Sequence, residues 1–192
     1  MLPEVPAASR MILADRSNYL TRPPIFPGYD LIVIHCTDGH PAALGVAQMW
    51  QQPGASGKHT SAHFVIGQDG EAIQCVPLAF AAQHAHNANA HSVGIEHCAR
   101  TPGEWDKALG HHDPGLPPSD ALYAKSAELV AYLLVAAGLP CDRDHVKGHA
   151  EADPATTHTR CPDGCGWDWD AYMSRVRIAY EALGSPPAPL VA

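Results

Sequence analysis

The clearest hydrophobic pattern along the chain is DLIVIHC at 30–36, an unbroken apolar run with several β-branched residues. Runs of this kind are typical of strands buried on both faces of a sheet, so we predict a central strand here. SVGIEHC at 92–98 predicts a further strand. AHFVIGQDGEAIQCVP at 62–77 predicts two strands joined near Asp69-Gly70, a dipeptide that accepts the backbone angles of a tight hairpin.

Three segments have the spacing of helices. Residues 41–52 carry helix formers after a proline suited to a first turn. Residues 119–138 begin with Ser119 as a candidate N-cap, place apolar residues on one stripe and end at Gly138. Residues 167–184 predict a last amphipathic helix.

The length of 192 residues is enough for one well-buried core, which favours a single α/β domain. We expect residues 1–29, rich in proline and polar residues, to form an ordered arm laid over the domain rather than part of its sheet. The domain itself would span 30–184, and 185–192 would be a flexible tail. Glycine and proline are frequent in 99–119, which predicts a functional loop, a lid or a mobile insertion.

The composition narrows the class of protein. Hydrophobic residues make up 46% of the chain and charged residues 17%, and no apolar run approaches the length that spans a bilayer. The net charge of -8 has the wrong sign for a nucleic-acid-binding protein. The amino terminus lacks the basic and apolar regions of a secretory signal, so synthesis in the cytoplasm is expected. No apolar stripe is left over for self-association, so we expect a monomer.

Cysteine and histidine are the residue types most relevant to a candidate metal site. The six cysteines are spread along a chain too large to need disulfides, and we interpret most of them as small buried hydrophobes, with Cys165 free or structural. The thirteen histidines are more unusual, because histidine is the commonest metal ligand in proteins. They justify a search for a metal site.

His35 is the first candidate ligand. Side chains alternate along a strand, so His35 shares a face with Val33 and Thr37, while Cys36 points the other way. His35 also stands at the carboxyl end of its strand, where open α/β sheets usually place their sites.

The second group of candidates lies in KGHAEADPATTHTRCPDG at 147–164. His149 and Cys161 are separated by a loop that is able to bring both side chains to one ion. Two neutral imidazoles and one thiolate would leave a Zn²⁺ ion with one open position for water, as in catalytic zinc sites. Asp163 remains an alternative third ligand, because a carboxylate would serve the same charge role.

Glu96 is the candidate acid–base group, since it is a carboxylate inside the apolar strand predicted at 92–98. Burial would raise its pKa, which suits a group that takes a proton from zinc-bound water and returns it to a leaving amine. The structural alternative is a carboxylate that caps a neighbouring loop.

These segments, in this order and at these spacings, resemble the zinc-dependent N-acetylmuramoyl-L-alanine amidase family, which includes AmpD-type amidases, bacteriophage amidases and peptidoglycan recognition proteins. The resemblance runs from about Ser17 to the final helix. It implies a central mixed β-sheet flanked by helices, with a groove that holds one Zn²⁺ ion. It also implies that His35, His149 and Cys161 are the metal ligands and that Glu96 is catalytic.

The chain departs from the family pattern at two positions. Some members carry a catalytic tyrosine where this chain has Ala62, so Glu96 must bear the proton transfer. AmpD-type enzymes carry an oxyanion-stabilising lysine where this chain has Thr159, whose hydroxyl donates one hydrogen bond but brings no charge. Arg160 is a candidate to compensate. His84 resembles a substrate-groove position of the family, and His63 is a second candidate of this kind.

The resemblance implies hydrolysis of the lactyl–L-alanine amide that joins N-acetylmuramic acid to the stem peptide of peptidoglycan. The substrate would be the polymeric wall, reached through a holin or a secretion machine, or cytosolic muropeptides. The alternative is a recognition module on the same fold that binds muropeptides without cutting them, generally after loss of the cysteine ligand. The presence of Cys161 and Glu96 favours the enzyme. A zinc hydrolase of another amide also remains open, because a fold does not fix a substrate.

Overall fold

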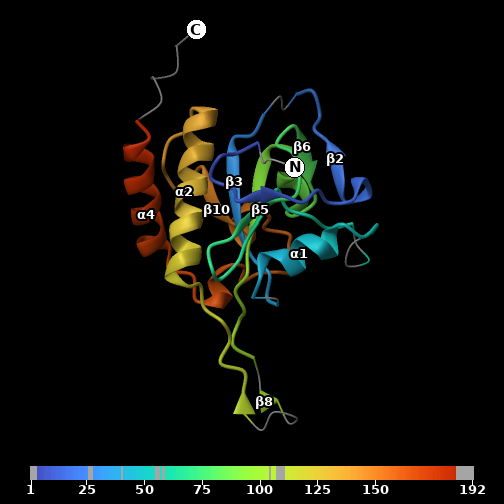
Figure 1. The fold of residues 1–192 in the computed structure, drawn as a ribbon, viewed down its shortest axis with the longest axis vertical. Helices are drawn as coiled ribbons and strands as arrows, with labels where there is room; N and C mark the ends of the chain where they lie inside the picture. Colours follow the sequence, from blue (N-terminus) through green and yellow to red (C-terminus); the bar gives the residue numbers. More distant parts are fainter. Residues whose placement is uncertain are drawn as a thin grey trace.

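A computed structural model of the chain describes residues 4–25, 28–39, 41–54, 57, 59–103, 105–106 and 111–184. A six-stranded mixed sheet with the strand order β1-β5-β4-β7-β3-β10 lies at its centre (Figure 1). The strands are β1 (Arg10–Met11), β3 (Leu31–Cys36), β4 (Phe64–Ile66), β5 (Ala72–Gln74), β7 (Ser92–His97) and β10 (Val146–Gly148). β7 pairs in parallel with both β3 and β4, and β3 pairs in parallel with β10.

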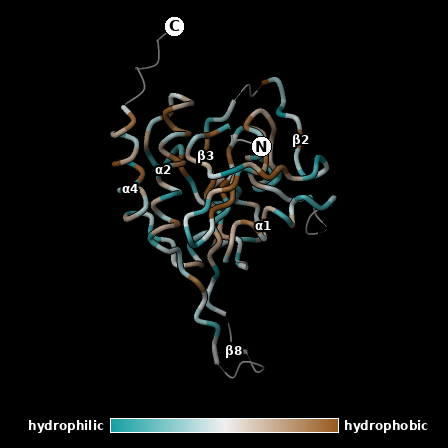
Figure 2. The backbone as a smooth tube through the Cα atoms, in the orientation of Figure 1, coloured by the Kyte–Doolittle hydropathy of each residue, from teal (hydrophilic) through white to brown (hydrophobic). Residues whose placement is uncertain are grey.

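Helices cover both faces of this sheet. The long helices α2 (Asp120–Ala137) and α4 (Trp169–Ala182) pack together on one face, and α1 (Ala43–Trp50) covers the other (Figure 1). Alternation along β3 divides its side chains between the faces: Ile32 and Ile34 join the core under α2 and α4, whereas Val33 belongs to a separate cluster. The apolar colouring concentrates on the central strands (Figure 2). The predicted central mixed sheet flanked by helices is therefore confirmed.

The residues expected to begin and end the long helix and to form the hairpin turn have these roles in the structure. Ser119 caps α2, because its hydroxyl accepts a hydrogen bond from the backbone N–H of Leu122. Gly138 ends the helix with a φ of 67°. β4 and β5 form the predicted antiparallel hairpin, and Gly70 supplies the positive φ of 81° that its turn requires.

The amino-terminal segment is more closely integrated than the sequence predicts. β1 joins the central sheet as an edge strand parallel to β5, and β2 (Tyr19–Thr21) pairs with β6 (Phe80–Ala82) in a separate two-stranded sheet. The buried guanidinium of Arg22 donates to the carbonyl oxygens of Leu78, Ala90 and Ser92. A two-residue strand shows no alternation in sequence, so its place at the sheet edge was not predictable. The expected tail, 185–192, lies outside the described residues.

The segment 99–119 contains two short strands, β8 (Trp105–Asp106) and β9 (His111–His112), paired as a hairpin that extends from the body of the domain (Figure 1). At its base Arg100 and Leu116 form a backbone bridge, and Arg100 pairs with Asp113. A function for this loop stays a prediction. None of the described helices has the length and apolarity to cross a membrane.

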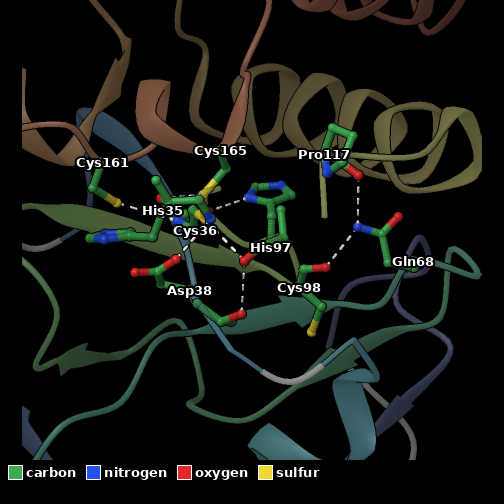
Figure 3. Close-up of a disulfide and its surroundings, with 12 residues drawn as sticks. His35, Cys36, Asp38, Gln68, His97, Cys98, Pro117, Cys161 and Cys165 are labelled. Atoms are coloured by element: carbon green, nitrogen blue, oxygen red, sulfur yellow. Dashed lines mark hydrogen bonds between the residues drawn. A yellow bond between two sulfur atoms is a disulfide. The ribbon is translucent and has the colours of Figure 1, made fainter. Parts of the chain in front are cut away.

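The cysteines have two different roles. Cys75 and Cys98 are buried free thiols, as expected from their apolar surroundings. Cys36 and Cys165 form a disulfide instead, which links the end of β3 to the short turn before α4 (Figure 3). The interpretation as small buried hydrophobes is therefore wrong for Cys36, and Cys165 is structural. The two residues are 129 positions apart, so local patterns in the sequence could not pair them.

Candidate metal centre

Parallel pairing brings three candidate residues to one edge of the sheet. His35 on β3 is the register partner of Glu96 on β7, so the two side chains emerge side by side on the same face. On the other side of β3, Gly148 of β10 pairs with Ile34, and His149 follows directly at the start of α3 (His149–Ala152). His35 is thus flanked by Glu96 and His149 at the carboxyl ends of parallel strands.

The candidate ligand atoms of His35, His149 and Cys161 lie within 4.8 Å of one another. The rings of the two histidines have their centroids 4.6 Å apart, and both residues are buried. Cys161 reaches them from the loop after α3, which is tied to the helix by a hydrogen bond from Ala150 N–H to the Cys161 carbonyl. The Cys161 sulfur accepts a hydrogen bond of 3.3 Å from the backbone N–H of Cys36 (Figure 3).

Asp163, the alternative third ligand, does not belong to this cluster. Its Oδ1 accepts a hydrogen bond of 2.9 Å from the indole N–H of Trp169. Asp163 therefore turns toward the start of α4, and the geometry favours Cys161.

The cluster opens into a cavity of about 590 Å³, a size suited to a small ligand. Its walls come from the ends of β3 and β7, from α1 and from the loops that carry the candidate ligands. Residues on these walls include His35, Glu96, His149, Cys161, Met49 and Trp50. A smaller adjoining cavity of about 260 Å³ shares Cys161 and is lined by Thr159 and Arg160.

Glu96 has the electrostatic character expected of a buried acid. Its Oε2 atom is buried and has no hydrogen-bond partner among the described residues, and burial raises the pKa of the carboxyl to about 8. Nε2 of His149 is likewise buried and has no hydrogen-bond partner within the described part of the chain, although Oδ2 of Asp153 lies 3.9 Å away. Such atoms are costly unless a bound species supplies a partner, and two imidazoles with a thiol are a donor set that zinc prefers. The residues present therefore fit a zinc ion.

Burial also keeps the three candidate ligands uncharged. It lowers the pKa of His149 to about 4 and holds the pKa of His35 well below its usual value. It raises the pKa of the Cys161 thiol to about 12. The imidazoles are therefore ready to bind a metal, whereas the thiol must release its proton as it binds.

His84 contacts the cluster directly, because its Nδ1 lies 2.9 Å from Nε2 of His35. Its other nitrogen, Nε2, lies 3.2 Å from the hydroxyl of Ser92. The ring covers Gly94, where a Cβ atom would lie 2.6 Å from ring atoms. His84 lines the large cavity, but hydrogen bonds within the protein engage both of its nitrogens.

His63 is fully buried, and its Nδ1 accepts a hydrogen bond from the Gly94 N–H. This position does not support the predicted contact with a substrate. Sequence reasoning overlooked Ser92, which strand alternation places on the same face as Gly94 and Glu96. That alternation was the available signal.

The fold and the cluster define a class: a single α/β domain with a His–His–Cys candidate metal site beside a carboxyl group and open to a cavity. Residues 24–164 match the family model for N-acetylmuramoyl-L-alanine amidase, and the chain belongs to this family. No curated protein sequence matches the chain.

Solved structures share the fold at low sequence identity. A selenomethionine derivative of AmpD is 23% identical with a TM-score of 0.63, and the match covers 93% of this chain and 98% of that one. The PlyG catalytic domain is 21% identical with the same TM-score and the same coverage. The amidase LysC from Clostridium intestinale URNW is 17% identical with a TM-score of 0.57, covering 87% of this chain and 97% of its own.

The raised pKa of Glu96 predicts that the zinc-free protein becomes less stable as the pH rises. The pKa of this carboxyl is about 8 in the folded protein and about 4.5 in the unfolded chain, so the stability it contributes is complete below pH 4.5 and is lost as the pH rises through 8. The free energy of unfolding of Glu96→Gln relative to wild type should therefore increase with pH in this window, by at most about 1.4 kcal/mol per pH unit.

Urea unfolding with a chelator at pH 5.5 and 7.5 measures this difference, and the comparison with wild type cancels the titration of the histidines. Glu128→Gln, at an exposed site on α2, is the control and should follow the wild type at both pH values. A difference in the free energy of unfolding between Glu96→Gln and wild type that is the same at both pH values would contradict the raised pKa of Glu96.

Proposed function

We propose that the protein is a zinc-dependent N-acetylmuramoyl-L-alanine amidase that hydrolyses the lactyl–L-alanine amide of peptidoglycan or its muropeptide fragments. The observation that carries the proposal is the convergence of His35, His149 and Cys161 beside Glu96 in the wall of a cavity. Membership of the amidase family supports the choice of bond. Residues 30–184 would form the catalytic domain.

His35, His149 and Cys161 would hold the ion. Two neutral imidazoles and one thiolate leave a net positive charge and a vacant position in a tetrahedral site. Bound zinc supplies Lewis-acid polarisation of the scissile carbonyl and acidifies a water molecule.

Glu96 would move the proton. A cation at the adjacent ligand cluster favours the ionised carboxylate, so it opposes the effect of burial on the pKa. The carboxylate accepts a proton from the attacking water and delivers it to the nitrogen of the departing L-alanine. This role needs a carboxylate that faces the cavity and is free of partners inside the protein. Oε2 of Glu96, which has no hydrogen-bond partner among the described residues, meets the second condition.

Thr159 and Arg160 would act on the oxygen side of the reacting carbonyl. Both line the small cavity that adjoins the cluster at Cys161. The Thr159 hydroxyl donates a hydrogen bond to the carbonyl oxygen as negative charge develops there. The exposed Arg160 guanidinium adds a positive charge at the rim and contacts the substrate. His84, also predicted to bind substrate, has both ring nitrogens engaged and belongs instead to the surroundings of the ligands.

Replacing Glu96 by Gln should abolish turnover and leave the zinc content unchanged, because the amide fills the same volume but accepts no proton. Purified peptidoglycan and a synthetic muramyl peptide serve as substrates, and newly exposed L-alanine amino groups are counted. Glu128→Gln is the matched control and should retain full activity. A zinc-loaded Glu96→Gln enzyme with normal turnover would remove Glu96 from the mechanism. A zinc-loaded wild type that binds the peptide without cutting it would establish the recognition module instead.

Replacing Thr159 by Val should lower kcat by about 10²-fold with little change in KM, since the hydrogen bond matters mainly in the transition state. Thr157→Val, two positions away in the same loop, tests whether any loss of a hydroxyl there has this effect. Steady-state kinetics on the muramyl peptide provides the comparison. Equal kcat values for wild type and Thr159→Val would exclude the oxyanion role.

A further inference from the structure

A chain of hydrogen-bonding groups runs from the backbone to the first candidate ligand. The Ser92 hydroxyl lies 2.6 Å from the carbonyl oxygen of Ala88 and 3.2 Å from Nε2 of His84. Nδ1 of His84 lies 2.9 Å from Nε2 of His35. The chain therefore ends on one of the two nitrogens by which His35 could bind a metal.

The direction of each hydrogen bond in this series follows from the first acceptor, the carbonyl oxygen of Ala88. A carbonyl oxygen only accepts, so the Ser92 hydroxyl donates to Ala88 and its oxygen accepts from Nε2–H of His84. A neutral imidazole has one donor and one acceptor nitrogen, so a His84 ring that donates from Nε2 accepts at Nδ1, and the facing nitrogen of His35, 2.9 Å away, carries the hydrogen. Nδ1 of His84 is then the acceptor, and Nε2–H of His35 is the donor.

We propose that Ser92 and His84 are positioning residues that hold His35 in the tautomer protonated at Nε2, which leaves the Nδ1 lone pair for the metal. The zinc part of this inference rests on the proposed function. The tautomer part rests on the hydrogen bonds alone. Partners of this kind fix both the orientation and the protonation of a histidine ligand.

The packing around His84 leaves its ring little freedom. Gly94 provides the space for the ring, since a Cβ at that position would lie 2.6 Å from it. The side-chain oxygen of Asn89 accepts from the backbone N–H groups of His84 and Ala85, at 2.9 and 2.6 Å. Ser92 is completely buried on β7. Ser92 therefore lies on a strand, and His84 lies in a loop that is held by the Asn89 side chain. A positioning role requires this rigidity.

The first measurement reads the tautomer in the zinc-free protein, by two-bond ¹H–¹⁵N correlation spectra of a histidine-labelled sample. We expect His35 to be protonated at Nε2 in the wild type. Ser92→Ala removes the acceptor that orders His84, so this variant should show a mixture of His35 tautomers. This readout needs neither metal nor substrate, so failure of the amidase proposal would leave its outcome interpretable.

The second measurement is zinc affinity, obtained by competition with a chromophoric chelator. We expect Ser92→Ala to weaken zinc binding about tenfold and His84→Phe by about 10–100-fold, the range found for partners of metal ligands. Ser126→Ala is the matched control, because its buried hydroxyl lies 2.7 Å from Nε2 of His97, whose Nδ1 meets the backbone carbonyl of His35 and not a nitrogen of its ring. This control should bind zinc as the wild type does.

Two results would overturn the proposal. One is a zinc-free wild type in which His35 is protonated at Nδ1. The other is a folded Ser92→Ala protein with the wild-type tautomer and the wild-type zinc affinity. A parallel loss of affinity in Ser126→Ala would also count against it, because the effect would then not require a contact to the ring nitrogen of His35.

Discussion

The parallel pairing of β3 with β7 and β10 is the constraint on which the candidate site depends. It sets His35 beside Glu96 in register and delivers His149 to the same edge from the end of β10. Because side chains alternate along a strand, a shift of β3 by one residue would turn His35 into the core beneath α2 and α4. The same alternation that places the apolar side chains of β3 in the core therefore places His35 on the face of the candidate site.

Burial gives the site its electrostatic character. The same desolvation that raises the pKa of Glu96 and Cys161 lowers that of the two histidines, so the zinc-free site is held uncharged. A divalent cation at the cluster would favour the thiolate and the carboxylate, and would meet imidazoles that are already neutral. The Cys36–Cys165 disulfide fastens the loop beyond Cys161 to the end of β3 (Figure 3), so the third candidate ligand lies between two anchored segments.

Features that depend on local periodicity were predictable from the sequence. The strand at His35 and its outward face, the hairpin at Gly70 and the limits of α2 all follow from patterns within a few residues. Features that depend on contacts between distant segments were not. The pairing of Cys36 with Cys165 is one example, and the contact of His84 with Ser92 is another. The choice between Cys161 and Asp163 was open in sequence, since it depends on how the loop folds back.

X-ray absorption at the zinc edge of the purified, zinc-loaded protein tests the central claim most directly, because it counts the ligands by element. We expect one ion per chain, with one sulfur at about 2.3 Å and two imidazole nitrogens at about 2.0–2.1 Å. Replacing Cys161 by Ser should remove the sulfur shell, whereas Cys98→Ser should leave it intact. A spectrum of the wild-type protein without sulfur, or with several sulfurs, would contradict a centre built from His35, His149 and Cys161.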